Sequence, residues 1–212
     1  MVLDKKVAEQ TINFLTQINA IKLNTKNPFT WTSGIKSPIY CDNRLVLSYP
    51  KIRDFIADNM SQIIKIKYGN DISIAGVATG AIAMGIMIAE RLDLPYAYVR
   101  PEPKGHGLKN QIEGNIDKKS SVVVIEDLIS TGKSSLNAIN ALKSDGYNVM
   151  GMLSIFSYNF EFANKKFVSE KITIDSLADY NTLVEIIESK GELSDEEISR
   201  LKKWREDPKS WG

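Results

Sequence analysis

The stretch VVVIEDLISTGKSS, residues 122–135, decides the fold. It begins with four β-branched apolar residues, a pattern typical of a strand buried on both faces in the middle of a parallel sheet. Glu126 and Asp127 follow at the carboxyl end of that strand. A small-residue turn, Ser130-Thr131-Gly132, then leads into an amphipathic run over 134–142 that predicts a helix. The chain is therefore organised around a buried strand, an acidic pair, a hydroxyl-rich turn and a helix.

The turn before this predicted helix is suited to an anion. The unpaired backbone N–H groups and the positive dipole end at a helix start favour a phosphate monoester. Thr131, Ser134 and Ser135 add hydroxyl donors, and Gly132 allows a close approach of the backbone. The two carboxylates can accept hydrogen bonds from vicinal sugar hydroxyls. Taken together, these residues predict a site for a ribose 5-phosphate.

The stretch has two other interpretations. Gly132-Lys133-Ser134 matches the end of a Walker A loop, but that loop needs a glycine where this chain has Asp127, so it is rejected. The second is a buried strand that ends in polar residues before an ordinary helix cap. On the physics of the stretch alone, this second interpretation stays open.

The same residues resemble a family signature. An apolar run, Glu-Asp, two apolar residues and Ser-Thr-Gly-x-Ser are similar to the phosphoribosyl-pyrophosphate motif of type I phosphoribosyltransferases. The resemblance implies that the acids hold the ribose hydroxyls, with Asp127 counted as catalytic, and that the turn holds the 5-phosphate. It implies that phosphoribosyl pyrophosphate contacts Glu126, Asp127, Leu128, Ile129, Ser130, Thr131, Gly132, Lys133 and Ser134. Ser130 also matches the family position that contacts an orotate base.

Residues 29–44, FTWTSGIKSPIYCDNR, form a second informative stretch. Aromatic, hydroxyl and basic residues alternate without helical periodicity, which predicts a hairpin or flap. A plain surface hairpin is one interpretation. The pattern is also similar to the amino-terminal hood of orotate phosphoribosyltransferases. Some members carry a substrate-contacting lysine where this chain has Thr32, so that role is not transferred, and Lys36 stays unassigned.

A polar, cationic segment follows the short strand predicted over 96–99. Such a long polar connection in a compact domain is typical of a lid, a binding loop or disorder. A cationic lid suits a pyrophosphate leaving group, although a solvated basic loop is the plainer interpretation. The spacing R-x-x-x-K-x-H-G resembles the catalytic loop of orotate phosphoribosyltransferases and implies roles for Arg100, Lys104 and His106 in phosphoribosyl pyrophosphate binding, with Lys104 and His106 also catalytic. Many members have a second lysine where this chain has Pro101.

The rest of the chain alternates between predicted helices and strands. Spacing of apolar residues predicts helices over 5–22 and 81–92 and strands over 71–78 and 149–156. We expect a last strand over 172–175, a helix that Ser176 caps, and a terminal helix that a capping box starts at Ser194. The family resemblance makes the backbone of Thr79, Gly80 and Ala81 a candidate pyrophosphate contact. Some relatives carry an orotate-binding arginine where this chain has Ser157.

Composition bounds the class of protein. The chain has 212 residues, 43% of them hydrophobic, which is enough for one sizeable core. Its net charge of +1 gives no electrostatic case for nucleic acid or an anionic membrane. A single cysteine, Cys41, fits a reducing compartment, and no apolar stretch reaches membrane-spanning length, so a cytoplasmic location is expected.

These patterns predict an α/β fold, a parallel sheet with helices on both faces and ligands at the carboxyl ends of its strands. We expect a single domain over 1–212, with a small hood over about 1–45, a core over about 46–190 and a terminal helix over about 194–205. The resemblance implies the type I phosphoribosyltransferase fold.

The function implied by the resemblance is Mg²⁺-dependent transfer of phosphoribose from phosphoribosyl pyrophosphate to orotate. It also implies a homodimer whose catalytic loop is shared between subunits, in pyrimidine biosynthesis, and Mg²⁺ held without an all-protein cage. A phosphoribosyltransferase for a purine or uracil, and a regulator that only senses phosphoribosyl pyrophosphate, are the alternatives. The hood pattern argues against the first, and the retained Lys104 and His106 argue against the second.

Overall fold

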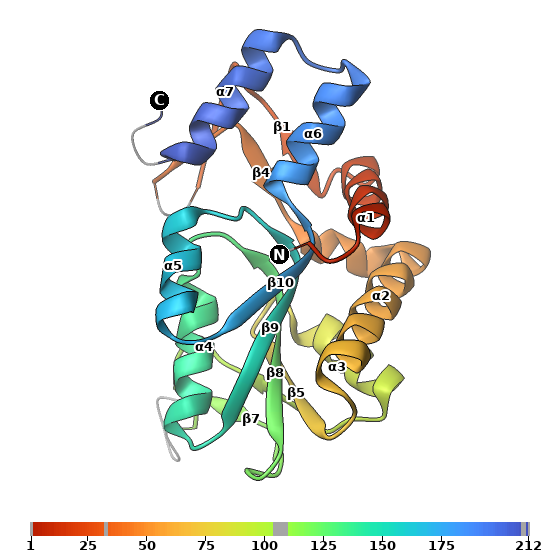
Figure 1. The fold of residues 1–212 in the computed structure, drawn as a ribbon, viewed down its shortest axis with the longest axis vertical. Helices are drawn as coiled ribbons and strands as arrows, with labels where there is room; N and C mark the ends of the chain where they lie inside the picture. The colour runs from red at the N-terminus through yellow and green to blue at the C-terminus, as the bar shows by residue number, and fades with distance from the viewer. Residues whose placement is uncertain (1, 32–33, 104–109, 209–210, 212) are drawn as a thin grey trace.

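A mostly parallel sheet forms the centre of the molecule. The computed structural model describes residues 2–31, 34–103, 110–208 and 211. Across these residues the main sheet has six strands in the order β10-β9-β8-β5-β6-β7 (Figure 1). The strands are β5 (Ile72–Val77), β6 (Tyr96–Val99), β7 (Ile112–Glu113), β8 (Ser121–Ile129), β9 (Asn148–Ser157) and β10 (Thr173–Asp179). All neighbours pair in parallel except β7, which pairs antiparallel with β6. The predicted α/β fold is confirmed, and β7 is a short strand that the sequence pattern did not predict.

The central strand β8 is buried on both faces, as its apolar run predicts. Val123 and Ile125 pack into one hydrophobic core, while Val122 and Val124 pack into a second core on the opposite face. The strand extends beyond the acidic pair, because residues up to Ile129 still pair with β9. Glu126 and Asp127 therefore lie within the second half of β8 and do not simply follow it.

Helices cover both faces of the sheet (Figure 1). One face carries α1 (Lys5–Gln17), α2 (Pro50–Tyr68) and α3 (Ile82–Leu92), and the other carries α4 (Lys133–Ser144) and α5 (Glu161–Ser169). Within the described residues, no helix combines the length and the apolar character needed to cross a bilayer.

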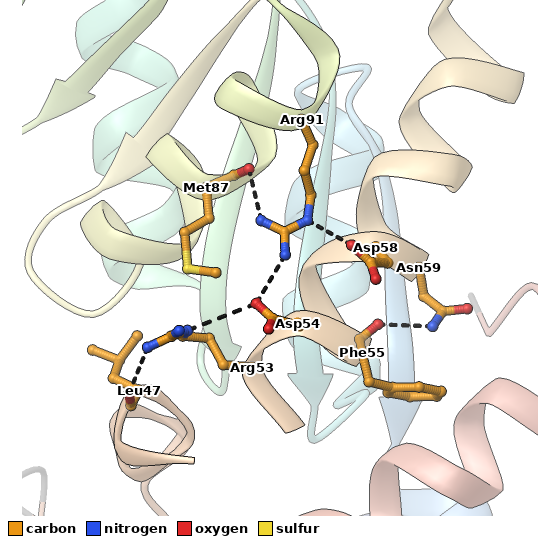
Figure 2. Close-up of polar contacts among 8 residues, drawn as sticks. All are labelled: Leu47, Arg53, Asp54, Phe55, Asp58, Asn59, Met87 and Arg91. Carbon is orange, nitrogen blue, oxygen red and sulfur yellow. Dashed lines mark hydrogen bonds and ion pairs between the residues drawn. The ribbon is translucent and has the colours of Figure 1, made fainter. Parts of the chain in front are cut away.

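Ion pairs fasten α3 to α2 (Figure 2). The Arg91 guanidinium on α3 donates to Asp58 Oδ1 at 2.6 Å and to Asp54 Oδ1 at 2.9 Å, both on α2. Its Nη1 also donates to the Met87 carbonyl of α3 at 3.2 Å, and this third hydrogen bond fixes the orientation of the guanidinium. Because α3 begins directly after the β5 turn, this network fixes the helix that follows residues 79–81.

The amino-terminal hood is built from short antiparallel pairs. β1 (Ile21–Leu23) pairs with β4 (Ile39–Cys41), β2 (Phe29–Thr30) pairs with β3 (Lys36–Ser37), and the 3-10 helix η1 (Asn43–Ser48) follows. The predicted hairpin is thus confirmed. The helix predicted over 5–22 is too long, because α1 ends at Gln17 and Asn19 adopts a φ of 57° that turns the chain into β1.

Helix α7 (Asp195–Glu206) braces the hood from the other end of the chain. The Trp204 side chain is fully buried, and its Nε1 donates to the Lys36 carbonyl at 2.9 Å. Its ring centroid lies 5.7 Å from that of Trp31 and 5.7 Å from that of Tyr158. The first and last parts of the chain therefore share one aromatic cluster above the carboxyl edge of the sheet. The capping box predicted at Ser194 is confirmed.

The prediction for the last strand and its helix is wrong in detail. Ser176 does not cap a helix; it lies inside β10, where its hydroxyl lies 2.7 Å from that of Ser154. Asp179 is the actual cap of α6 (Tyr180–Lys190), accepting a hydrogen bond from the Thr182 N–H at 2.9 Å. Both residue types favour the cap position, so only pairing with β9 decides between them. Helix α5 was not predicted.

Candidate functional site

The acidic pair lies near the carboxyl end of β8 and is held from several sides. Glu126 is only 3% exposed, and its Oε2 accepts a hydrogen bond from the Ser135 hydroxyl of α4 at 2.9 Å. Its Oε1 accepts one from the Asp127 backbone N–H at 3.2 Å. Asn43, at the start of η1, donates from Nδ2 to the Asp127 carbonyl at 2.7 Å. Strand, helix and hood thus meet at this pair.

Burial raises the pKa of both carboxyl groups. For Glu126 the largest cause is the loss of hydration on burial, and the neighbouring charge of Asp127 raises the pKa further. The hydrogen bond from the Ser135 hydroxyl partly opposes the shift. Burial also raises the pKa of Asp127, and the positive charge of Arg44 is among the groups that oppose it. A buried and a half-buried carboxyl group side by side favour binding a cation, a diol or a positive charge that develops during a reaction.

The turn after β5 packs directly against Asp127. A Cβ atom built on Gly80 would clash with the Asp127 carboxylate, so a larger residue fits here only if that carboxylate moves. The predicted segment 79–81 is therefore in contact with the acidic pair through Gly80. A cis peptide bond joins Ala78 to Thr79 at the start of this segment.

We expect Gly80→Ala to lower kcat/KM by about 10²-fold, because the added methyl group must displace the Asp127 carboxylate. It should also destabilise the fold by about 1–3 kcal/mol through overpacking. Steady-state assays and urea unfolding measure both effects. The control is the same change in an Asp127→Ala background, where the carboxylate is gone and the added stability cost should be small. An equal stability cost in both backgrounds would contradict the contact.

The hydroxyl-rich turn joins β8 to α4. Gly132 has a φ of +74°, and a Cβ atom there would lie 2.9 Å from the Phe167 ring. Helix α4 begins at Lys133. The unpaired backbone N–H groups of its first turn therefore lie just after Ser130 and Thr131 in the chain. Leu128 and Ile129 end β8, and the Ile129 side chain is buried, so only its backbone faces the turn. Lys133 and Ser134 are exposed in the first turn of α4.

A cavity of about 400 Å³ opens beside this turn. Its walls come from the hood, the end of β8 and the segment after β9: Thr30, Trp31, Tyr40, Cys41, Leu128, Ser130, Thr131 and Tyr158. The size and the aromatic lining are typical of a site for a small planar molecule. A larger cavity of about 580 Å³ lies between α5 and β10, but the acidic pair and the hydroxyl-rich turn do not line it.

Arg100 lies at the end of β6, at the base of the predicted catalytic loop. Its Nη1 is 3.4 Å from Glu113 Oε1 on β7, and its carbonyl accepts a hydrogen bond from Gln111 Nε2 at 2.8 Å. Lys104 and His106, the other two predicted loop residues, lie outside the described residues, as does Thr32. The structure therefore brings together residues 126–134 and 79–81 and places Arg100 at the foot of the loop.

Several site residues were missed by sequence reasoning. Asn43 anchors the hood to Asp127, and Trp31, Tyr40 and Tyr158 wall the cavity. The aromatic residues of 29–44 were a visible signal, but Tyr158 lies far along the chain, and its place in the wall depends on the tertiary fold.

The comparisons with known proteins agree with this geometry. The family model for the phosphoribosyl transferase domain matches residues 46–170. The chain is 47% identical to an orotate phosphoribosyltransferase of Phocaeicola vulgatus, over 99% of this chain and 97% of that one. It is 46% identical to an orotate phosphoribosyltransferase of Porphyromonas gingivalis, over 93% of this chain and 94% of that one.

A solved structure has a similar fold. The crystal structure of orotate phosphoribosyltransferase from Aeropyrum pernix matches with a TM-score of 0.75 and 30% identity, covering 86% of this chain and 99% of that one. Sequence and fold lead to the same group of enzymes. The chain therefore belongs to the phosphoribosyltransferase family and, within it, to the orotate phosphoribosyltransferases.

Proposed function

We propose that this chain transfers the 5-phosphoribosyl group from phosphoribosyl pyrophosphate to N1 of orotate, in pyrimidine biosynthesis. The observation that carries the proposal is the acidic pair of β8, set between the α4 turn and an aromatic cavity. The bond between C1′ and a pyrophosphate oxygen breaks, and pyrophosphate leaves with the electron pair. The bond between C1′ and N1 forms, and N1 gives up its proton. The products are orotidine 5′-monophosphate and pyrophosphate.

Each part of the site has a role in this reaction. Glu126 and Asp127 accept hydrogen bonds from the ribose hydroxyls and face the positive charge that builds on the ribose. Thr131, Gly132, Lys133 and Ser134 hold the 5-phosphate at the start of α4. The base lies in the cavity against Ser130. Arg100, Lys104 and His106 stabilise the charge that develops on pyrophosphate, where such groups contribute most.

The residues present are suitable for Mg²⁺. This ion keeps several waters and takes one or two carboxylates together with substrate oxygens, which the Glu126–Asp127 pair can supply. Within the described residues no group of three or more His, Cys, Asp or Glu side chains forms a metal cage. When bound with the substrate, Mg²⁺ would neutralise charge on the pyrophosphate.

We further propose a homodimer in which the loop after Arg100 acts in the partner's site. Exposed apolar side chains support a subunit contact, namely Leu45 and Leu47 on η1, Tyr49 beside it and Ile86 on α3. We also propose that the chain works as a single domain, because buried residues of hood, sheet and α7 share one core. A cytoplasmic location, without nucleic acid or membrane partners, completes the proposal.

A base panel tests the function. The protein is incubated with phosphoribosyl pyrophosphate, Mg²⁺ and one base at a time, and pyrophosphate release is measured. We expect orotate to be converted and uracil, adenine, guanine and hypoxanthine to be used far less. Preferred release with a purine or uracil would overturn the orotate assignment. Binding of phosphoribosyl pyrophosphate without turnover of any base would favour the sensing regulator.

A further inference from the structure

The base cavity has no cation among its described lining residues. Trp31, Tyr40 and Tyr158 provide aromatic surface, and Thr30, Ser130 and Thr131 provide hydroxyl groups. Orotate carries a carboxylate, and a carboxylate removed from water is stable only when paired or well hydrogen-bonded. Under the proposed function, a positive side chain outside this lining would stabilise the substrate more strongly than the hydroxyl groups of the lining do.

The structure of the substrate indicates where that side chain should lie. The carboxylate of orotate is attached to C6, the ring carbon bonded to N1, and N1 is the atom that joins C1′ of the ribose. The carboxylate must therefore lie next to the anomeric carbon. In this site the ribose is assigned to Glu126 and Asp127, so the cation is needed near Asp127 and at the mouth of the cavity.

The hood segment 40–44 connects these two places. Tyr40 and Cys41 line the cavity, and the Cys41 thiol donates a hydrogen bond to Asn43 Oδ1 at 3.2 Å. The Asn43 amide in turn donates to the Asp127 carbonyl at 2.7 Å. This connection fixes the backbone of the next residue, Arg44, between the base cavity and the acidic pair.

The Arg44 guanidinium is already oriented. Its Nε and Nη2 donate to the two oxygens of Asp42 at 2.7 and 2.9 Å, a bidentate pair that fixes the plane of the group. Within the described part of the chain, Nη1 has no bonded partner, and the side chain is 60% exposed. The positive charge of Arg44 is one of the groups that oppose the rise in the pKa of Asp127 caused by burial. The pKa of Arg44 is raised first by its hydrogen bond to Asp42, and the charge of Asp127 adds to this rise. A cation with a free N–H edge therefore lies within electrostatic range of Asp127.

We propose that Arg44 binds the carboxylate of orotate through its Nη1 edge, with Asp42 as the residue that positions the guanidinium. The proposal rests on the proposed function and specifies how the substrate's charge is recognised. Arg44 thereby makes the site selective for a pyrimidine carboxylate over uracil. Lys36 is the competing hood cation, because its pairing partner in the β2–β3 ribbon is the cavity residue Thr30.

The test compares a charged with a neutral base. Arg44→Gln should raise the KM for orotate by about 10- to 100-fold, the range for losing a hydrogen bond to a charged group. The KM for phosphoribosyl pyrophosphate and the inhibition constant of orotamide, the uncharged 6-carboxamide, should stay unchanged. Arg44→Lys keeps the charge without the planar fork and should give an intermediate KM.

Two matched variants complete the experiment. Lys36→Gln removes the other hood cation and should leave the KM for orotate unchanged. The double variant Asp42→Asn with Arg44→Gln should show the same raised KM for orotate as Arg44→Gln alone. That result would mean that the KM rises because the attraction to Arg44 is lost, and not because an unpaired Asp42 repels the substrate. Because Arg44 is exposed and bonds only Asp42 among the described residues, these variants should keep the wild-type melting temperature.

Three outcomes would overturn the inference. An equal loss for orotate and orotamide would mean that Arg44 only shapes the pocket. A raised KM for phosphoribosyl pyrophosphate alone would place Arg44 on the pyrophosphate. An orotate-specific loss in Lys36→Gln instead of Arg44→Gln would make Lys36 the partner. If the wild-type protein does not convert orotate at all, the proposed function itself fails, and that result is separate from all three.

Discussion

Asp127→Asn should lower kcat/KM by about 10²–10³-fold while the protein folds normally. The asparagine keeps the size of the side chain, so the close contact with Gly80 is retained. The Asp127 carbonyl that Asn43 binds is a main-chain group and is unaffected. What is lost is a negative charge facing the ribose as positive charge develops there, an electrostatic contribution of the kind that gives effects of this size. Steady-state kinetics with orotate and phosphoribosyl pyrophosphate measure it.

Asp58→Asn is the matched control. Asp58 is also a carboxylate, but it lies on α2 and pairs with Arg91 of α3 (Figure 2). This variant should keep full activity, and its change in stability should stay within about 1 kcal/mol, as for other exposed pairs. Near-native turnover by a folded Asp127→Asn protein would remove Asp127 from the reaction.

Mixing two inactive variants should restore activity to roughly a quarter of the wild-type value, by the two-fold symmetry of the proposed dimer. The variants are Asp127→Asn and Lys104→Ala, unfolded together and allowed to reassociate. About half of the dimers should then be hybrids. If Lys104 acts in the partner's site, each hybrid has one intact site and one site with both lesions.

Two controls define the result. Each variant taken alone through the same refolding should remain inactive, and analytical ultracentrifugation should show dimers in every sample. If the loop serves its own chain, every site in the mixture carries a lesion and mixing restores nothing. A monomer in solution would exclude the shared site before any assay is made.

The sequence predicted the parts of the molecule that depend on local pattern. The buried run of β8, the turn at Gly132 and the capping box at Ser194 are all local, and the structure has each of them. The errors arise where a distant partner decides. Ser176 has the chemistry of a helix cap, yet pairing with β9 keeps it in a strand. Helix α5 lacks a side-chain cap at its start, so the usual signal of a helix start was missing.

Within the site, too, local patterns were predicted and contacts between distant parts of the chain were not. The residues of 126–134 are neighbours in sequence and were predicted as a group. The contact between Gly80 and Asp127 joins the turn after β5 to strand β8, and the hydrogen bond from Asn43 to Asp127 joins the hood to the core. No short pattern contains such information, because strand order and strand length set these distances. The resemblance to a family supplied roles for single residues but not the contacts among them.

The aromatic cluster that joins Trp31 to Trp204 has a consequence for how the protein is made. One wall of the base cavity is supported by a residue in the last helix, so a chain still attached to the ribosome lacks that support while α7 is in the exit tunnel. The sheet can assemble as its strands emerge, since domains fold during synthesis. The cavity for the base is therefore complete only once α7 has emerged and Trp204 has packed against Trp31.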